Sequence, residues 1–241
     1  MNIAHYLTDD NKHWWHLWTC DSLCSKVKCQ KNSEKVSDKS EETRADILLA
    51  AFNEIYLRGF QAASLRNILK NTGATKGAIY HHFDHKLGLG YAVVDEVIRE
   101  TIRSTWIDPL KHSDDPITVL QNTLLMTGKS MTTKDVSRGC PLNNLGQEMS
   151  PIDEGFKQRI GDIYQEWQET IEHALDRGIL AGNVSRSIDS KEISLLFVVT
   201  LQGSLGFAKS VQNLDALMSC GQGLSDRIET LRPSKKSIGK Q

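Results

Sequence analysis

Residues 76–81 place cationic, polar and small side chains on one side of a short predicted helix. By the roughly 100° step of a helix, this side carries Lys76, Gly77, Tyr80 and His81. An ammonium, a phenol and an imidazole can hydrogen-bond phosphate oxygens or base edges, and a glycine leaves room for close approach. The chemistry that this side favours is noncovalent contact with nucleic acid.

The positive charge of the chain is concentrated around the same residues. The whole chain has 29 Lys and Arg against 30 Asp and Glu, so its net charge is close to zero. Between residues 58 and 86, however, the only acid is Asp84, and the basic residues are Arg58, Arg66, Lys70, Lys76 and Lys86. Cations that neutralise phosphates release condensed counterions, so a basic patch favours nucleic-acid binding. An ordinary solvated charged face is the alternative.

Two short helices joined by a tight turn are expected to position these side chains. Ser64 can cap the first helix with its hydroxyl, Gly73 can end it, and Thr75 can cap the second helix. The inward positions are Leu65, Ile68 and Leu69 in the first helix and Ile79, His82 and Phe83 in the second. This pattern is typical of a helix-turn-helix, whose second helix enters the major groove of DNA. A helical hairpin within an all-α core is the alternative.

The chain resembles TetR/AcrR-type transcriptional regulators over the run Ala-Thr-Lys-Gly-Ala-Ile-Tyr-His-His-Phe-Asp-His-Lys-Leu, residues 74–87. The similarity extends from about Glu41 to Glu96. Leu87 departs from the acidic residue common at its position, which weakens the capping of the next helix without changing the DNA face. With Ser64 and Arg66 of the first helix added, the DNA-binding residues implied are Ser64, Arg66, Thr75, Lys76, Gly77, Tyr80, His81 and Lys86, the last as a phosphate contact.

The size and composition of the chain suit an ordinary folded protein. Its 241 residues, 39 % of them hydrophobic, suffice for one large domain or two smaller ones. The longest apolar run, residues 193–207, is interrupted by polar side chains and predicts no membrane span. No signal peptide is recognisable, so the predicted location is the cytoplasm, and the five cysteines are expected to be thiols.

Four regions are predicted along the chain. They are an atypical extension over 1–38, a helix-turn-helix DNA-binding domain over 39–85, a helical regulatory and dimerisation domain over 86–232, and a basic tail over 233–241. The extension contains His13, Trp14, Trp15, His16, Trp18, Cys20, Cys24 and Cys29, and a linker-like polar stretch follows from Lys31 to Ser40. Its His and Cys spacing matches no common zinc finger, so no metal is predicted, and a disordered or loosely docked extension is favoured. A metal site built from these residues is the alternative.

The remaining segments predict helices only, so the fold class is all-α. A helix over Glu41 to Leu57 is expected to back the motif, and Asp84 or His85 to start a helix reaching about Trp106. Gly88 and Gly90 weaken that helix, either as a pivot or as surface glycines without a mechanical role. Further helices are expected from Pro116 to Met131, Leu142 to Met149, Ser150 to Gly178, Asp189 to Gln212 and Leu214 to Leu231.

The resemblance also implies a small-molecule pocket between Trp106 and Gly178. Candidate lining residues are Trp106, Met126, Met131, Cys140, Leu142, Met149, Phe156, Tyr164 and Trp167, and ordinary core packing is the alternative for each. Cys140 lies between Gly139 and Pro141 near a helix start, where a thiol sensor of oxidants or electrophiles is a second hypothesis.

The penultimate helix is apolar nearly all round, so it must be buried on more than one side. Resemblance to the family implies that the last two helices form a four-helix bundle with a second copy of the chain. The interface residues predicted on this helix are Ser194, Val198, Leu201, Gly203, Ser204, Leu205 and Phe207. Burial within a single subunit is the alternative.

These observations predict a ligand-responsive transcriptional repressor that binds a palindromic double-stranded DNA operator as a homodimer and is released by a small-molecule effector. The alternative is a thiol- or metal-sensing DNA-binding regulator that uses Cys140 or the N-terminal Cys and His cluster. No Gly-rich phosphate loop or catalytic nucleophile motif indicates an enzyme, and no cofactor is expected.

Overall fold

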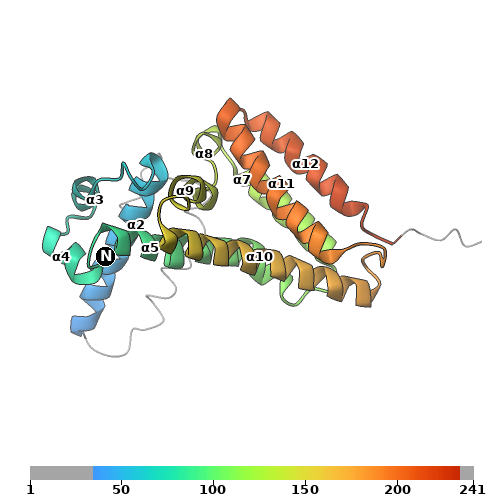
Figure 1. Cartoon of the computed structure of the whole chain (residues 1–241), viewed down its shortest axis with the longest axis horizontal. Coiled ribbons are helices and arrows are strands. Elements are labelled where there is room, and N and C mark those ends of the chain that lie inside the picture. The colour runs from blue at the N-terminus through green and yellow to red at the C-terminus, as the bar shows by residue number, and fades with distance from the viewer. Residues whose placement is uncertain (1–34, 234–241) are drawn as a thin grey trace, which may run out of the picture. The chain divides into compact units, whose positions relative to one another are not determined.

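The computed structural model describes residues 35–233, with side chains from residue 40 onward. These residues form helices and no strands, which confirms the all-α fold class (Figure 1). They divide into two units. The first unit combines the residues up to Thr101 with Arg138–Ile163, and the second combines Ile102–Ser137 with the residues from Tyr164 onward. The His, Trp and Cys residues predicted to characterise the N-terminal extension lie outside the described residues, as does most of the basic tail.

The first unit contains the predicted helix-turn-helix. Its helices are α2 (Lys35–Arg58), α3 (Leu65–Thr72), α4 (Lys76–His82), α5 (Lys86–Ala92), the π-helical η3 (Val93–Ile98), the start of α6 (Arg99–Ile102), α9 (Pro141–Met149) and the first part of α10 (Glu154–Ala181). Helix α2 begins six residues before the expected Glu41, inside the stretch assigned to a linker. Its polar first turns lack apolar periodicity, which starts only near Ile47, so the sequence pattern does not reveal them.

The core of the first unit is built around α2, which contacts α3, α4, α5 and η3. Ile47 and Phe52 of α2 are at most 2 % exposed, as are Ile68 of α3, Ile79 of α4 and Leu89 of α5. Of the inward positions predicted for the helix-turn-helix, Ile68, Ile79 and Phe83 are buried core positions, whereas Leu65, Leu69 and His82 are half-buried.

Several predicted helix starts are confirmed by their capping hydrogen bonds. The Thr75 hydroxyl accepts the Ala78 N–H at 3.2 Å at the start of α4, and His85 Nδ1 accepts the Gly88 N–H at 3.0 Å at the start of α5. Asp115 caps α7 (Pro116–Ser130) in the same way through the Thr118 N–H. Short-range capping chemistry thus fixes these boundaries.

One predicted cap and one predicted helix start are wrong. Ser64 occupies the position before α3, but its hydroxyl makes no capping hydrogen bond. Ser150 ends α9 instead of starting α10, and the carboxylate of Asp153 accepts the Phe156 N–H at 2.8 Å there. In the second case a charged acceptor three residues further on takes the role, because a carboxylate accepts backbone N–H groups more strongly than a hydroxyl does.

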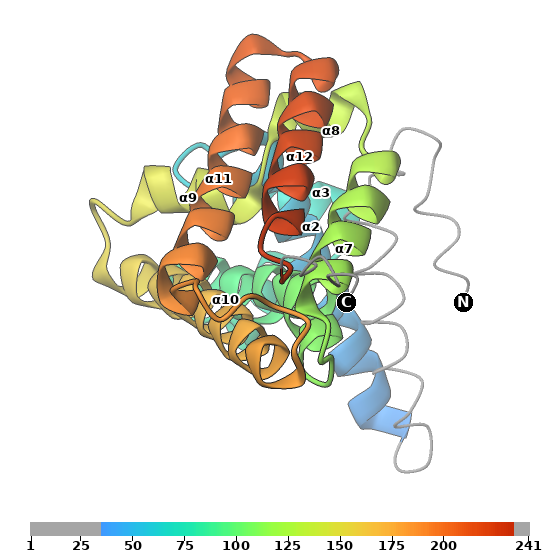
Figure 2. The same ribbon diagram turned by 90° about the vertical axis from the view of Figure 1, so that its right-hand side faces the viewer.

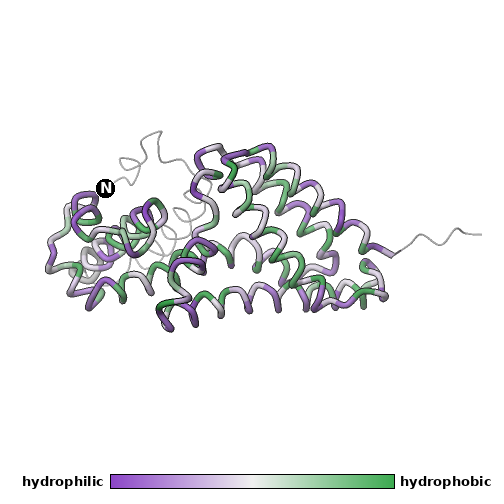
Figure 3. Tube along the Cα trace, turned by 45° about the horizontal axis from the view of Figure 1, so that its top comes forward, coloured by the Kyte–Doolittle hydropathy of each residue, from purple (hydrophilic) through white to green (hydrophobic). Residues whose placement is uncertain are grey.

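The second unit is a set of long helices around a shared interior. Its elements are the π-helical η4 (Arg103–Ile107), the short η5 (Asp108–Leu110), α7 (Pro116–Ser130), α8 (Thr133–Arg138), the remainder of α10, α11 (Ser190–Val211) and α12 (Leu214–Glu229). Helix α12 packs against both α7 and α11 (Figure 2). Hydrophobic residues recur along these helices (Figure 3), as the apolar periodicity predicts.

Helix α10 does not stop at Gly178 as predicted. It continues to Ala181 and ends at Gly182, whose φ of +79° is the left-handed conformation that glycine adopts without strain. A Cβ at Gly178 would lie 2.5 Å from Val184 Cγ2 and 2.9 Å from Pro116 Cδ. Gly178 is therefore required by close packing inside the helix, which a sequence pattern cannot distinguish from a helix stop.

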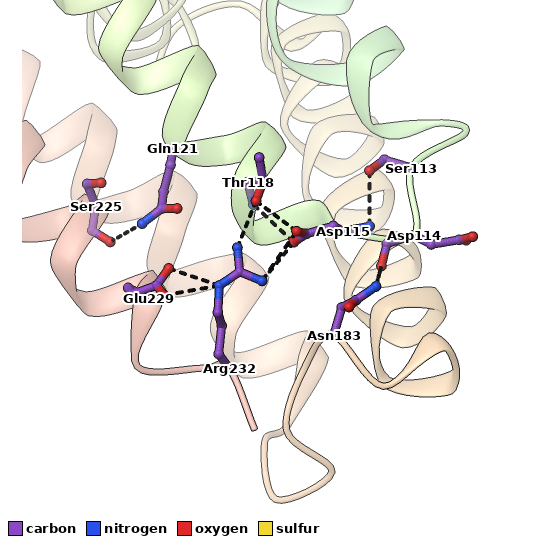
Figure 4. A network of polar contacts seen from close by, with 9 residues as sticks. All are labelled: Ser113, Asp114, Asp115, Thr118, Gln121, Asn183, Ser225, Glu229 and Arg232. Carbon is purple, nitrogen blue, oxygen red and sulfur yellow. Dashed lines mark hydrogen bonds and ion pairs between the residues drawn. The ribbon is translucent and has the colours of Figure 1, made fainter. Parts of the chain in front are cut away.

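A polar network ties the end of α12 to the start of α7 (Figure 4). The Arg232 guanidinium donates to Asp115 at 3.1 Å, to Glu229 at 3.0 Å and to the Thr118 hydroxyl at 2.7 Å. Burial by itself raises the pKa of Asp115, but hydrogen bonds from Thr118 and Arg232 outweigh it and hold that pKa below its ordinary value. The carboxylate is thus part of what holds these two helix ends together.

One described helix, α11, has the length and apolar composition that would suffice to cross a membrane, contrary to the expectation for residues 193–207. A third of the window concerned is buried inside the fold, and the interior helix of a helical domain meets the same criterion. This finding does not by itself identify a membrane span.

Candidate nucleic-acid interface

The outward side of α3 and α4 carries most of the predicted DNA-binding residues. The exposed members of the set are Arg66, Thr75, Lys76, Gly77, Tyr80 and His81. Between the two helices, Gly73 has a φ of +66° and donates its N–H to the Leu69 carbonyl at 3.0 Å. That left-handed residue ends α3 and reverses the chain, as predicted.

Tyr80 and Lys76 form a pair on the exposed side of α4. Lys76 Nζ lies 5.8 Å from the centroid of the Tyr80 ring, and the Tyr80 side chain is 44 % exposed. The four-residue spacing brings the two side chains onto one face of the helix. The ammonium and the phenol are therefore presented outward together, within one helical turn.

His81 and His82 are neighbours with different surroundings. Their ring centroids are 5.0 Å apart, and His81 is exposed whereas His82 is half-buried. Burial lowers the pKa of His82, and the nearby His81 and Arg44 lower it further. The neutral form of His82 is thus favoured on the inner side of α4, and His81 is the exposed imidazole.

Lys86, the predicted phosphate contact, has partners within the chain. Its Nζ donates to the Gln61 carbonyl at 3.1 Å and lies 4.9 Å from the centroid of the Phe60 ring. Ser64, the other half-buried member of the predicted set, also lies close to this loop before α3. The ammonium of Lys86 therefore holds the loop in this structure, and its contact with phosphate stays a prediction.

Glu54 organises the start of α3 and is not among the predicted residues. The side chain is 6 % exposed, and its Oε1 accepts the Ser64 N–H at 3.2 Å and the Asn67 amide at 2.8 Å. Arg58 Nε lies 3.3 Å from the same oxygen. The sequence gives one indication of this role. Glu54 follows Ile47 by seven residues, so its carboxylate lies on the apolar face of the helix.

Arg44 joins α2 to η3 and to the end of α4. Its guanidinium donates two hydrogen bonds to the Glu96 carboxylate, one of them 2.7 Å long, and lies 5.0 Å from the centroid of the Phe83 ring. The hydrogen bonds to Glu96 raise the pKa of Arg44. A two-point ion pair of this kind fixes orientation as well as distance.

The loop between α2 and α3 is held by α9. The Glu148 carboxylate accepts the backbone N–H groups of Phe60 and Gln61, each at 2.8 Å. Next to them Gly59 has a φ of +81°, and a Cβ there would lie 2.8 Å from Glu148 Oε2. The close approach of carboxylate and backbone thus requires a glycine at this position.

Phe60 anchors the same loop in the core of the first unit. Its ring meets that of Phe156 edge to face at a centroid distance of 4.8 Å. A Cβ at Gly90 would lie 2.4 Å from Phe60 Cε2 and 2.8 Å from Phe156 Cζ. Gly90 is therefore a buried packing residue, which corrects its interpretation as a pivot or a surface glycine.

Two family models match separate regions of the chain. Residues 47–93 match the model of bacterial regulatory proteins of the tetR family, and residues 116–220 match the tetracyclin repressor-like C-terminal domain. The chain belongs to the TetR family. It is therefore a DNA-binding transcriptional regulator and not an enzyme.

Relatives of this TetR-family chain agree with the assignment. It is 26 % identical to an HTH-type transcriptional regulator from the lacX 3′ region of Lactococcus lactis subsp. lactis, over 83 % of this chain and 96 % of that protein. It is 24 % identical to the HTH-type transcriptional repressor DhaR of Mycobacterium sp. strain GP1, over 76 % of this chain and 89 % of that one.

Solved structures of TetR regulators share the fold. The regulator from Cytophaga hutchinsonii superposes with a TM-score of 0.71 at 20 % identity, covering 82 % of this chain and 98 % of that one. The protein from Rhodobacter sphaeroides gives 0.67 at 22 % identity, covering 76 % and 97 %.

The candidate pocket residues of this TetR regulator do not gather in one unit. Trp106, Met126, Met131, Tyr164 and Trp167 belong to the second unit, and Cys140, Leu142, Met149 and Phe156 belong to the first. Two expectations are corrected. Phe156 packs between Phe60 and Tyr91 in the core of the first unit, and Met126 is 68 % exposed on α7, so neither lines an enclosed site within its unit.

The residues predicted for the dimer interface also differ in how far they are buried. Four of them lie inside the second unit, because their face of α11 is turned to its interior: Ser194, Val198, Leu201 and Ser204. Gly203 and Phe207 are exposed, and Leu205 is half-buried. The outward side of α11 carries apolar residues that the predicted set omitted, namely Leu195, Leu196, Val199 and Val211.

The thiol and metal alternatives gain no support from the described residues. Cys140 is 3 % exposed, so a reagent reaches its sulfur only if the surrounding structure opens. Within the part of the chain that the structure describes, no group of three or more His, Cys, Asp and Glu side chains could hold a metal ion.

Proposed function

We propose that this TetR regulator is a repressor that binds a palindromic operator as a homodimer and is released by a small-molecule effector. The proposal that α4 contacts the bases of DNA rests on the outward side of this helix. Lys76, Gly77, Tyr80 and His81 are exposed together there. This side offers a cation and hydrogen-bonding groups on a helix backed by the core residue Ile79. Such a protein acts in the cytoplasm, where its operator lies.

The outward side of α11 supports a homodimer. Leu195, Leu196, Val199, Phe207 and Val211 are each about half exposed, at 49–57 %. Apolar residues repeated along one exposed helix face indicate a surface that another protein covers. Because a palindrome has two equivalent half-sites, a second copy of this chain is the partner that matches the proposed operator.

Repression and release by an effector are supported by one feature each. The relative DhaR is named a repressor, and the second unit has an aromatic interior at Trp106 and Trp167. An effector shifts the protein toward a DNA-incompetent state only if it binds that state more tightly. In the first unit, the Glu148 contact with the loop before α3 is a link through which a displacement of α9 would reach the DNA-reading helices.

Selection of bound fragments from random duplex DNA, read by sequencing, tests the proposed function. The full chain at low salt is expected to enrich a palindrome, and Lys76→Ala to lose the enrichment. Lys129→Ala is the control, because Lys129 is an exposed cation on α7 in the second unit. Equal enrichment by wild type and Lys76→Ala would contradict the assignment of α4 as the reading helix. Enrichment of a site without two-fold symmetry would contradict the homodimer.

A further inference from the structure

Glu54 is a carboxylate enclosed where α2 meets α3. It is 6 % exposed, and among the carboxylates that the structure describes in the first unit it alone is buried. A buried carboxylate has lost its water, so it depends on the donors that surround it. Two of these donors belong to the start of α3. Glu54 is therefore a polar link between the helix that backs the motif and the first helix of the motif.

Three donors converge on one oxygen of this carboxylate. Its Oε1 accepts the Ser64 N–H at 3.2 Å and the Asn67 side-chain amide at 2.8 Å, and Arg58 Nε lies 3.3 Å away. Ser64 and Asn67 lie about one turn apart, so two directional bonds to one atom fix the rotation of α3 as well as its distance from α2. Apolar packing at Ile68 does not do this by itself, because the hydrophobic effect is not directional.

The rotation of α3 decides which of its side chains face outward. Arg66 and Lys70 are exposed on this helix, and Asn67, which lies between them in sequence, is half-buried. Successive side chains of a helix point in directions about 100° apart, so the bond from Asn67 to Glu54 turns Arg66 away from α2. The short turn at Gly73 joins α3 to α4, so the setting of α3 also limits where the outward side of α4 points.

A carboxylate is the group that suits this position. An ionised carboxylate only accepts hydrogen bonds, and each of its three neighbours donates. A glutamine would offer one acceptor oxygen and would bring two further N–H donors toward Arg58 and Asn67. A leucine would suit the apolar side of α2, but it would leave Asn67 and the Ser64 N–H without this acceptor. The polar link can thus be removed without removing the apolar packing.

We propose that Glu54 is a positioning residue for operator recognition, whose carboxylate sets the rotation of α3 and thereby the side chains that the motif presents to base edges. Base contacts depend on the orientation of donors and acceptors, whereas long cationic side chains reach phosphates over a range of orientations. Glu54 therefore acts on discrimination between DNA sequences and not on affinity for DNA in general. This inference rests on the proposed function and names a further residue on which operator recognition depends.

The test compares two duplexes of equal length, the site enriched from random DNA and an unrelated sequence, with the full chain. The ratio of their dissociation constants measures discrimination. For Glu54→Leu this ratio is expected to fall about tenfold, while affinity for the unrelated duplex changes less than about threefold. Ile55→Val, at the next and buried residue of α2, is the control that should lower the thermal midpoint and keep the ratio. A Glu54→Leu protein with the wild-type ratio overturns the inference.

Reversal of the hydrogen bond separates positioning from packing. Glu54→Gln and Asn67→Asp are each expected to lower the ratio, the first because an acceptor is lost and the second because two carboxylates then face each other. In the double variant Glu54→Gln/Asn67→Asp, the new amide donates to the new carboxylate and its oxygen accepts the Ser64 N–H, so most of the discrimination should return. A double variant whose loss equals the product of the two single losses overturns the inference, because the two side chains are then independent.

The same measurements separate this inference from the proposed function. Because the specific duplex is whichever site is enriched, a site without two-fold symmetry contradicts the homodimer and still decides the role of Glu54. A ratio that falls in Glu54→Leu but not in Lys76→Ala supports the inference and contradicts α4 as the reading helix. A ratio that falls in Lys76→Ala but not in Glu54→Leu contradicts the inference alone.

Discussion

The carboxylate of Glu148 accepts the backbone N–H of Phe60 at 2.8 Å. Eighty-eight residues separate the two in the chain, and the bond fixes the loop before α3 to helix α9. The second oxygen of the same carboxylate accepts the neighbouring Gln61 N–H, so these two backbone donors depend on one side chain. The placement of the helix-turn-helix within the first unit thus depends on a residue far outside it in sequence.

Replacement of Glu148 is expected to destabilise the first unit. Glu148→Ala leaves two backbone donors without their charged acceptor and should lower the free energy of unfolding by about 1–3 kcal/mol. Glu148→Gln keeps one acceptor oxygen and should lose less. Denaturant unfolding measures both, with Glu154→Ala as the control, because its exposed ion pair with Lys157 contributes little. Equal stability of Glu148→Ala and wild type would show that the two hydrogen bonds do not hold the loop.

Two nearby glycines are expected to respond in opposite ways to alanine. Gly90→Ala places a methyl group against Phe60 and Phe156 and should destabilise the protein by about 1–3 kcal/mol. Gly88→Ala meets nothing closer than the Phe83 carbonyl oxygen at 3.5 Å and should gain up to about 1 kcal/mol of helix propensity. Thermal unfolding of the two variants compares them directly. A Gly90→Ala protein as stable as wild type would show that the packing around Phe60 adjusts freely.

Loss of a phosphate-binding lysine should change the salt dependence of operator binding. For Lys86→Ala the slope of log K against log salt is expected to fall by about one, and affinity should weaken for all sequences alike. Because Lys86 Nζ already has a partner in the Gln61 carbonyl, this contact requires the ammonium to exchange or share that partner. Binding titrations at several salt concentrations measure the slope. A slope equal to that of wild type and of Lys129→Ala would restrict Lys86 to holding the loop.

A charge on the outward side of α11 should separate the proposed dimer. Phe207→Asp introduces a carboxylate where an apolar side chain is 56 % exposed in the single chain, and it is expected to give monomers with weakened operator binding. Light scattering after size exclusion measures the mass. Leu180→Asp is the matched control, since Leu180 is 83 % exposed on α10. Dimers of unchanged affinity in the Phe207→Asp protein would place the interface elsewhere.

The Asp115 network should contribute to stability in a pH-dependent way. Since the pKa of Asp115 is lower in the folded protein than its ordinary value, its contribution is complete above about pH 5 and is lost as the pH falls through the lowered pKa. Asp115→Asn should therefore lower stability at neutral pH and make the loss between about pH 5 and 3 less steep. Denaturant unfolding across this range, with the exposed neighbour Asp114→Asn as control, measures both. Identical pH profiles for wild type and Asp115→Asn would remove Asp115 from the acid response.

The features predictable from sequence are those that depend on neighbours along the chain. The outward side of α4, the turn at Gly73 and the cap at Thr75 follow from helical period and local hydrogen bonding, and the structure has them as predicted. Two residues that position the helix-turn-helix were missed because they act outside their own local sequence. Glu54 and Glu148 act on a loop that no local pattern connects to them.

Close packing and uniform hydrophobicity limited the other predictions. Glycine is common in flexible segments and at helix ends, which is the interpretation that sequence favours for Gly90 and Gly178. Their actual role is set by side chains that pack against them from other elements. Helix α11 is apolar nearly all round, so its period could not indicate which side faces the interior. For this reason the predicted interface includes Val198 and Leu201, which are buried, and omits Val199 and Leu195, which face outward.

The early start of α2 decides where the protein can be shortened. Removal of residues up to 38, the boundary that composition suggests, would delete the first turn of a helix that begins at Lys35. Helix ends fray, so such a cut would bring the loosened end within about two turns of Arg44, which holds Glu96 and covers the Phe83 ring. A fragment meant for crystallisation or operator footprinting therefore needs to begin before Lys35. Helix α2, against which α3 and α4 pack, then stays intact.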